Sequence, residues 1–102
     1  MGLNVLVAGI GSIGARHLKN LHDHKKGLGI DMLDAYDTDP GKVSPVHNYL
    51  DRFFDSTEQF TKPSIRPYDV CLICVPFEAQ RELIDHFIYN SRKTRLLVEK
   101  PL

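Results

Sequence analysis

The sequence lacks the features that would set it apart from ordinary globular proteins. Its 102 residues carry no excess charge of either sign, because 13 basic side chains balance 13 acidic ones. A neutral chain has no electrostatic field to gather nucleic acid or an anionic membrane, so neither partner is expected. The sequence has no apolar run of about 18 residues to span a bilayer. Its first residues lack the basic lead and cleavage site of a signal peptide. We therefore predict a soluble, cytoplasmic protein.

Cysteine is scarce, and the two that are present, Cys71 and Cys74, have a C-x-x-C spacing. Such a pair can indicate a redox or zinc site. Here it lies within the apolar segment DVCLICVP, which is typical of a strand buried on both faces, and residues three apart on a strand point to opposite faces. No second cysteine pair is present to complete a metal site, and the histidines do not have ligand spacing. We interpret both cysteines as core residues and predict no metal site.

Apolar runs alternate with helical patterns along the chain. Strands are predicted at residues 4–8, 30–36, 52–54, 68–75 and 95–98, and helices at 12–26 and 78–89, with brief helices near 46–50 and after Ser56. This alternation predicts a parallel sheet with right-handed crossovers. The expected fold class is α/β, a doubly wound parallel sheet of about five strands, in a single domain over residues 1–102.

Two of these strands are expected to be incompletely covered. Asp34 lies in the middle of the strand at 30–36, and a strand buried on both sides should not hold an unpaired carboxylate, so one face is expected to be poorly covered. In the sheet order 3-2-1-4-5, the strand at 95–98 lies at an edge and leaves Leu96, Leu97 and Val98 short of cover. Because an unprotected apolar edge tends to recruit a partner, self-association through this edge is predicted.

A glycine-rich turn follows the first predicted strand. In VLVAGIGSIGARH, Gly9, Gly11 and Gly14 have the G-x-G-x-x-G spacing. The first glycine allows a tight turn, the second lets a pyrophosphate approach the backbone, and the third lets the helix pack closely. The free amides at the start of the helix then face the phosphates. The pattern predicts a Rossmann-like domain that binds a dinucleotide. The alternatives are a purely structural turn, another nucleotide-type ligand and a decayed site.

An acidic residue ends the second predicted strand. Asp37 lies close to the expected offset of about 20 residues beyond the last glycine, where its carboxylate accepts hydrogen bonds from the adenosine ribose. A carboxylate there repels the additional phosphate of NADP, and the next residue, Thr38, is not a cation that would attract it. NAD is therefore favoured over NADP. Asp39 is the rival candidate for the ribose, but it is expected to cap the turn with Pro40.

Four segments taken in order, VAGIGSIGARHLKNL, AYDTDP, DVCLICVP and LLVEKPL, resemble the N-terminal half of the Gfo/Idh/MocA family of NAD(P)-dependent sugar oxidoreductases. The resemblance covers nearly the whole chain, and the E-K-P ending is its most particular part. It assigns to the cofactor Gly9, Gly11, Ser12, Ile13, Gly14, Asp37, Val75, Pro76, Glu99 and Lys100. It also makes Lys100 the catalytic residue, because an ammonium there would stabilise negative charge on a substrate hydroxyl as hydride leaves its carbon.

The sequence departs from the family in two respects. Position 80 is Gln80, where the family often has a histidine. The second α/β domain, which in the family binds substrate and supplies the catalytic acid or base, is absent from these residues. We therefore expect the cofactor half of an oxidoreductase, which would act on a sugar or polyol only if a substrate domain is supplied and is not catalytically competent by itself. The alternative is a stand-alone nucleotide-binding or interaction module without catalysis.

Overall fold

The computed structural model describes residues 2–90 and 93–99. Within them, five parallel strands form one sheet in the order β3-β2-β1-β4-β5. The elements in chain order are β1 (Leu3–Ala8), α1 (Ser12–Asp23), α2 (Lys25–Leu28), β2 (Ile30–Tyr36), η1 (Pro40–Lys42), η2 (Ser44–Tyr49), β3 (Arg52–Phe54), α3 (Thr57–Phe60), β4 (Val70–Ile73), α4 (Phe77–Asn90) and β5 (Arg95–Val98). The predicted fold class and strand order are confirmed.

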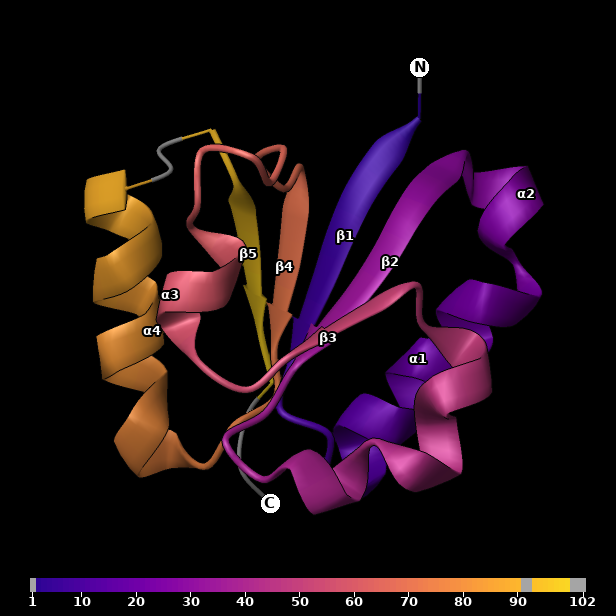
Figure 1. The fold of residues 1–102 in the computed structure, drawn as a ribbon, viewed down its shortest axis with the longest axis horizontal. Helices are drawn as coiled ribbons and strands as arrows, with labels where there is room; N and C mark the ends of the chain where they lie inside the picture. Colours follow the sequence, from indigo (N-terminus) through magenta and orange to yellow (C-terminus); the bar gives the residue numbers. More distant parts are fainter. Residues whose placement is uncertain (1, 91–92, 100–102) are drawn as a thin grey trace.

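Helices cover both faces of the sheet (Figure 1). α1 and α2 lie on one side, and α3 and α4 lie on the other. The chain moves outward from β1 through β2 to β3 and then returns to place β4 on the other side of β1. Right-handed crossovers in these two directions put their helices on opposite faces. The reversal between β1 and β4 opens a crevice at the carboxyl ends of these strands, which is where ligands bind in such sheets.

The core consists of two apolar clusters that β1 separates. Val5 and Val7 pack on the face covered by α1, where Leu18 joins them, whereas Leu6 and Ala8 pack on the face covered by α3 and α4. All of these side chains are buried. Burial on both faces explains why the sequence of this strand is continuously apolar and does not alternate with polar residues.

Asp34 is fully buried in β2, and the gap expected in the cover of this strand is not found. The Oδ2 atom of Asp34 accepts hydrogen bonds from the guanidinium of Arg52 at 2.7 and 3.0 Å and from the hydroxyl of Tyr68 at 2.6 Å. On the opposite face of β2, Leu33 and Ala35 are buried as well. The prediction was wrong because a buried carboxylate is tolerated where a cation and a further donor pair with one of its oxygens, although Oδ1 of Asp34 has no hydrogen-bond partner among the described residues. Arg52 and Tyr68, which supply these donors, lie far from Asp34 in the sequence.

The predicted helix at 12–26 is divided into two. His24 has φ −110° and ψ 14°, outside the helical region, so α1 ends at Asp23 and α2 begins at Lys25. The side chain of His24 contacts the carbonyl of Asn20 through its Nδ1 atom at 2.9 Å. Gly29 then ends α2 with a left-handed φ of 71°, a conformation that glycine adopts without strain.

Two other predicted boundaries change. The brief helix expected near 46–50 is found as the 3₁₀-helix η2, which begins earlier, at Ser44. A further 3₁₀-helix, η1, precedes it, and each of the two has a proline at its start. The strand predicted at 68–75 is confined to β4, Val70–Ile73, although the helix after Ser56 and the strands at 52–54 and 95–98 are found as expected. None of the helices within the described residues has the length and apolar character needed to cross a membrane.

Candidate cofactor-binding site

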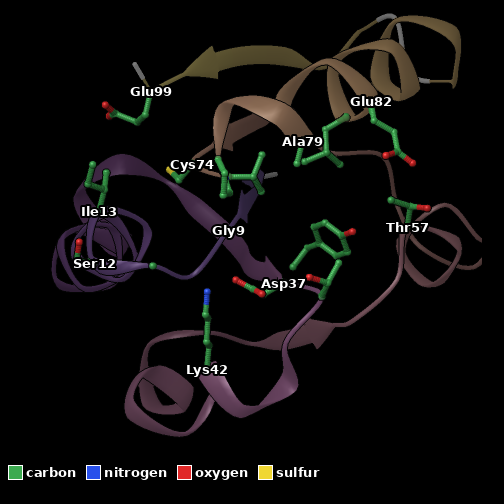
Figure 2. A pocket seen from close by; sticks show the side chains of 16 residues that line it. Gly9, Ser12, Ile13, Asp37, Lys42, Thr57, Cys74, Ala79, Glu82 and Glu99 are labelled. Atoms are coloured by element: carbon green, nitrogen blue, oxygen red, sulfur yellow. The ribbon is translucent and has the colours of Figure 1, made fainter. Parts of the chain in front are cut away.

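A cavity of about 560 Å³ lies at the carboxyl end of the sheet, where the segments that follow the paired strands β1 and β4 lead to helices on opposite faces (Figure 1). We call it the switch-point cavity. Eight of the residues assigned from the sequence line it, namely Gly9, Gly11, Ser12, Ile13, Asp37, Val75, Pro76 and Glu99. Figure 2 shows side chains from all sides of the crevice directed into it. Cavities of this size accept small-molecule ligands and cofactors.

The two remaining assigned residues are Gly14 and Lys100. Gly14 is buried in the first turn of α1 and is not among the residues that line the cavity. Lys100, the predicted catalytic residue, lies outside the described residues. The structure therefore brings eight of the ten assigned residues together around one cavity.

The three glycines of the turn have different surroundings. Gly9 has a φ of 100° and packs so closely on the backbone after β4 that an added Cβ would lie 2.7 Å from the carbonyl carbon of Cys74. An added Cβ at Gly14 would lie 1.8 Å from the carbonyl oxygen of Gly9. At Gly11, by contrast, a Cβ would meet no atom within 4 Å. Gly9 and Gly14 are thus required by the fold, whereas Gly11 leaves open space above the turn.

The N-terminus of α1 faces this open space. Gly11 is its N-cap residue, and no side chain among the described residues caps the helix. The first amides of a helix have no partner within it and therefore remain available to an anion. The favourable dipole contributes roughly 0.3–1 kcal/mol at an exposed site, so hydrogen bonds from the amides of Ser12 and Ile13 must supply most of the affinity for a phosphate.

Asp37 is held at the end of β2 by two backbone amides. Its Oδ2 atom accepts a hydrogen bond from Ile10 at 2.7 Å, and its Oδ1 atom accepts one from Asp39 at 2.9 Å. The side chain is only 7% exposed but lines the cavity. Each carboxylate oxygen accepts more than one hydrogen bond, so the fixed carboxylate retains capacity for a ligand hydroxyl. Asp39, the rival candidate, caps η1 through Gly41 as predicted and does not line the cavity.

Glu99 closes the opposite end of the cavity. Its Oε1 atom lies 2.6 Å from Nε2 of His17 on α1. The side-chain amide of Gln80 donates to the carbonyl of Glu99 at 2.9 Å and to that of Val75 at 3.3 Å. These contacts join the ends of β4 and β5 to each other and to α1. The sequence analysis did not identify His17, and it noted Gln80 only as a departure from the family, because the partners of both residues lie far away along the chain.

The cysteines pack on opposite faces of the sheet, as expected, with Cys71 buried in one core cluster and Cys74 partly buried against the other. Cys74 borders the cavity, which the sequence analysis did not anticipate. Burial raises the pKa of the Cys74 thiol to about 11, and the nearby Glu99 carboxylate contributes to the shift. Cys74 is therefore a neutral, unreactive thiol near pH 7. The described residues contain no cluster of ligands that would hold a metal ion.

Further cavity residues were also missed from the sequence. Lys42 reaches the cavity from η1, Thr57 from α3 and Glu82 from α4 (Figure 2). For each of these three residues, the neighbouring sequence indicates only a polar, solvated position. Their convergence depends on how the helices pack against the sheet, and no local motif reports it.

A family model described as an oxidoreductase family with an NAD-binding Rossmann fold matches residues 3–102. The chain belongs to this family, GFO_IDH_MocA. The resemblance drawn from the four sequence segments is thereby confirmed, as are the Rossmann fold and NAD as the cofactor of the family. This chain is an NAD-binding Rossmann domain of the GFO_IDH_MocA family.

Solved structures with a similar fold are dehydrogenases. The WlbA dehydrogenase of C. violaceum, in complex with NADH and UDP-GlcNAcA, has a TM-score of 0.78 and 17% identity over 98% of this chain. The scyllo-inositol dehydrogenase of Lactobacillus casei, with bound NAD(H) and scyllo-inositol, has a TM-score of 0.77 and 16% identity over 99%. The myo-inositol 2-dehydrogenase of Lactobacillus plantarum has a TM-score of 0.75 and 17% identity over 99%.

The TM-scores show that the fold is shared, and at 16 to 17% identity the similarity shows the fold alone. The GFO_IDH_MocA domain described here spans only 28 to 29% of the length of these three structures. No curated protein matches the chain.

Proposed function

We propose that NAD(H) binds in the switch-point cavity and that the complete protein transfers hydride between the nicotinamide ring and a hydroxyl group of a sugar or polyol. The observation that carries this proposal is the open space over Gly11, bounded by uncapped amides of α1 and by the fixed carboxylate of Asp37. The residues around the cavity fit a dinucleotide, because they offer anion donors and a ribose acceptor within one crevice.

Each cofactor residue then has a distinct role. The backbone at Gly11, Ser12 and Ile13 donates to the pyrophosphate, and Asp37 accepts from the adenosine ribose. Val75 and Pro76 form the wall beside the cofactor. Glu99, at the other end of the cavity, lies near the nicotinamide ribose. Their arrangement orients the reactive ring and excludes water from it, while NAD, when bound, supplies the hydride chemistry.

Lys100 is the proposed catalytic residue. It directly follows Glu99, which lines the cavity. An ammonium group at this position stabilises the negative charge that develops on a substrate hydroxyl oxygen as hydride leaves the carbon. The substrate class rests on the similar structures, two of which hold UDP-GlcNAcA or scyllo-inositol, a sugar derivative and a polyol. Binding such a substrate requires a further domain, supplied by the rest of a longer protein or by a partner.

The cavity favours NAD over NADP. The buried carboxylate of Asp37 repels an additional phosphate on the adenosine ribose. Lys42 lines the same cavity and would attract that phosphate, but its side chain is exposed and solvent screens its charge more strongly. We therefore expect NADPH to bind more weakly than NADH in parallel titrations.

We further propose that the exposed edge of the sheet, at β5, mediates self-association. Leu97 is 57% exposed and Val98 is 42% exposed on β5, which agrees with the lack of cover predicted for these two residues, whereas Leu96 is partly buried against the core. Sedimentation at increasing concentration should reveal a dimer, and a strict monomer at high concentration would refute the interface.

We also propose that the protein is cytoplasmic. The thiols of Cys71 and Cys74 are free, which suits a reducing compartment, and cell fractionation would test the location.

The proposed binding site is tested by comparing Gly11→Ala with Gly27→Ala. A Cβ at either position meets no atom within 4 Å, so both variants should fold as the unmodified chain does. The methyl group at Gly11 occupies the space over the turn and keeps the pyrophosphate from the amides. We expect Gly11→Ala to weaken NADH binding by at least about tenfold, which corresponds to the loss of a charge-assisted hydrogen bond.

The measurement is a fluorescence titration with NADH, accompanied by urea denaturation of each variant. Gly27 lies on α2, away from the cavity, and Gly27→Ala should bind NADH as the unmodified chain does. Equal affinity of Gly11→Ala and the unmodified chain would overturn the placement of the pyrophosphate. Failure of the unmodified chain to bind NADH at all would overturn the proposed function.

A further inference from the structure

The end of the switch-point cavity away from Glu99 carries a polar pair. Glu82 extends into the cavity from α4 and Thr57 from α3. Figure 2 shows both side chains at this end, beyond Asp37, while Glu99 lies at the other. Tyr36, Ala79 and Leu83 supply apolar surface in the same region. This end of the cavity therefore combines flat or apolar walls with a carboxylate.

The proposed cofactor placement determines what occupies this end. The pyrophosphate lies over Gly11, and the adenosine ribose lies against Asp37. The base attached to that ribose extends away from the pyrophosphate, toward Tyr36, Glu82 and Thr57. Apolar walls suit the faces of a purine ring, and polar groups suit its edge.

We propose that Glu82 accepts a hydrogen bond from the exocyclic 6-amino group of adenine and thereby selects a 6-aminopurine dinucleotide over one with a 6-oxopurine. This inference rests on the proposed function, since it assumes that a dinucleotide lies in the cavity. An ionised carboxylate only accepts hydrogen bonds, so it pairs with an amino group and is repelled by a carbonyl oxygen at the same position of the ring.

The surroundings of Glu82 leave its carboxylate available to a ligand. Within residues 2–90 and 93–99, no hydrogen bond or ion pair engages it. Burial raises the pKa of the Tyr36 hydroxyl, and the negative charges of Glu82 and Asp37 raise it further. The charge of Glu82 therefore acts on the Tyr36 hydroxyl inside the cavity, and this hydroxyl stays protonated beside the base.

The experiment compares two ligands and three proteins. The ligands are NADH and reduced nicotinamide hypoxanthine dinucleotide, which carries a carbonyl in place of the 6-amino group. The proteins are the unmodified chain, Glu82→Gln and Asp85→Asn. We expect the unmodified chain to bind the adenine form about threefold to tenfold more tightly, as one hydrogen bond of moderate strength would give. In Glu82→Gln this ratio should fall to near unity, because an amide both accepts and donates.

The ratio of the two dissociation constants separates recognition of the base from general electrostatics. Removing a negative charge strengthens the binding of both anionic ligands alike and leaves their ratio unchanged. Asp85 is exposed on the same helix and does not line the cavity, so Asp85→Asn controls for this effect and should keep the original ratio. Glu82 is exposed too, and thermal denaturation should show both variants folded.

Two results would overturn the inference while leaving the proposed function intact. One is equal binding of both ligands by the unmodified chain. The other is an unchanged ratio in Glu82→Gln, or a similar loss of the ratio in Asp85→Asn. If the unmodified chain binds neither ligand, the proposed function fails, and this inference fails with it.

Discussion

The Asp37 carboxylate holds the glycine turn against the end of β2. It accepts hydrogen bonds from the amides of Ile10 and Asp39, so its orientation is fixed before any ligand arrives. A preorganised acceptor loses less side-chain entropy on binding than an exposed one does. The residue that defines the ribose position in the sequence motif is thus also a structural link between β1 and β2.

Gln80 replaces a histidine that the family resemblance led us to expect, and its amide serves the fold. It is 8% exposed and donates to the carbonyl oxygens of Val75 and Glu99, which follow β4 and β5. We predict that Gln80→Leu, which keeps most of the volume but removes both donors, lowers the free energy of unfolding by about 1–2 kcal/mol. Urea denaturation monitored by circular dichroism would measure this loss.

Arg81→Gln provides the matched control for Gln80→Leu. Arg81 is the next residue on α4, is exposed and lies outside the cavity lining, so its substitution should change the free energy of unfolding by no more than about 0.5 kcal/mol. If Gln80→Leu were as stable as Arg81→Gln, the amide would not be linking the strand ends.

The turn between β1 and α1 depends on Gly14 for its geometry. Alanine at an interior helical position usually stabilises a helix relative to glycine, by up to about 1 kcal/mol. Here the added Cβ would lie 1.8 Å from the carbonyl oxygen of Gly9, and this atom belongs to backbone that cannot move without displacing the turn. The steric clash costs more free energy than the gain in helix propensity provides. Gly14→Ala should therefore destabilise the domain by about 3 kcal/mol or more, as measured by urea denaturation.

Gly27→Ala is the contrasting change, because Gly27 lies in α2 with open space at its Cβ position. It should be neutral or slightly stabilising in the same measurement. A Gly14→Ala variant with unchanged stability would mean that α1 can shift away from the turn, and the close packing of helix and turn described above would then be incorrect.

The alternation of apolar runs with helical periodicity was enough to predict the sheet. Each strand of a doubly wound sheet is buried on both faces, so its sequence is locally apolar, and glycines and prolines mark its ends. The break at His24, the 3₁₀-helix η1 and the 3₁₀ geometry of η2 were not predicted, because neither residue type nor spacing distinguishes them from a continuous or an ordinary short helix. They depend on local backbone angles that the packing of neighbouring segments determines.

Like the fold, the candidate site could be predicted from the sequence only in part. Its motif residues, Gly9, Gly11 and Asp37, were predicted because one short turn and the end of the next strand place them together. The contact between His17 and Glu99 joins positions 82 residues apart, and the one between Gln80 and Glu99 joins positions 19 apart. Such pairs follow from strand order and helix packing, and nothing in the local sequence around either partner indicates the other.

Alkaline pH should destabilise the whole domain, because two thiols and the hydroxyls of Tyr36 and Tyr68 keep their protons to higher pH in the folded state than in the unfolded chain. Burial raises the pKa of Cys71, Cys74 and Tyr68 in the folded state, in the case of Cys74 to about 11. An unfolded chain ionises its thiols near 9.0 and its tyrosines near 10.0, the ordinary values. Between pH 9 and 11 the unfolded state therefore binds fewer protons than the folded state, and unfolding becomes more favourable as the pH rises.

Urea denaturation at pH 8, 9 and 10 measures this effect, with the transition midpoint expected to fall across the series. Each thiol that stays protonated in the folded state lowers the free energy of unfolding by up to about 1.4 kcal/mol for each pH unit above the pKa of that thiol in the unfolded chain. Cys74→Ala removes one such proton without opening the core, since Cys74 is only partly buried at the edge of the cavity. Its midpoint should therefore fall less steeply with pH than that of the unmodified chain. A midpoint that stays constant from pH 8 to 10 would mean that these thiols ionise as readily in the folded domain as in the unfolded chain.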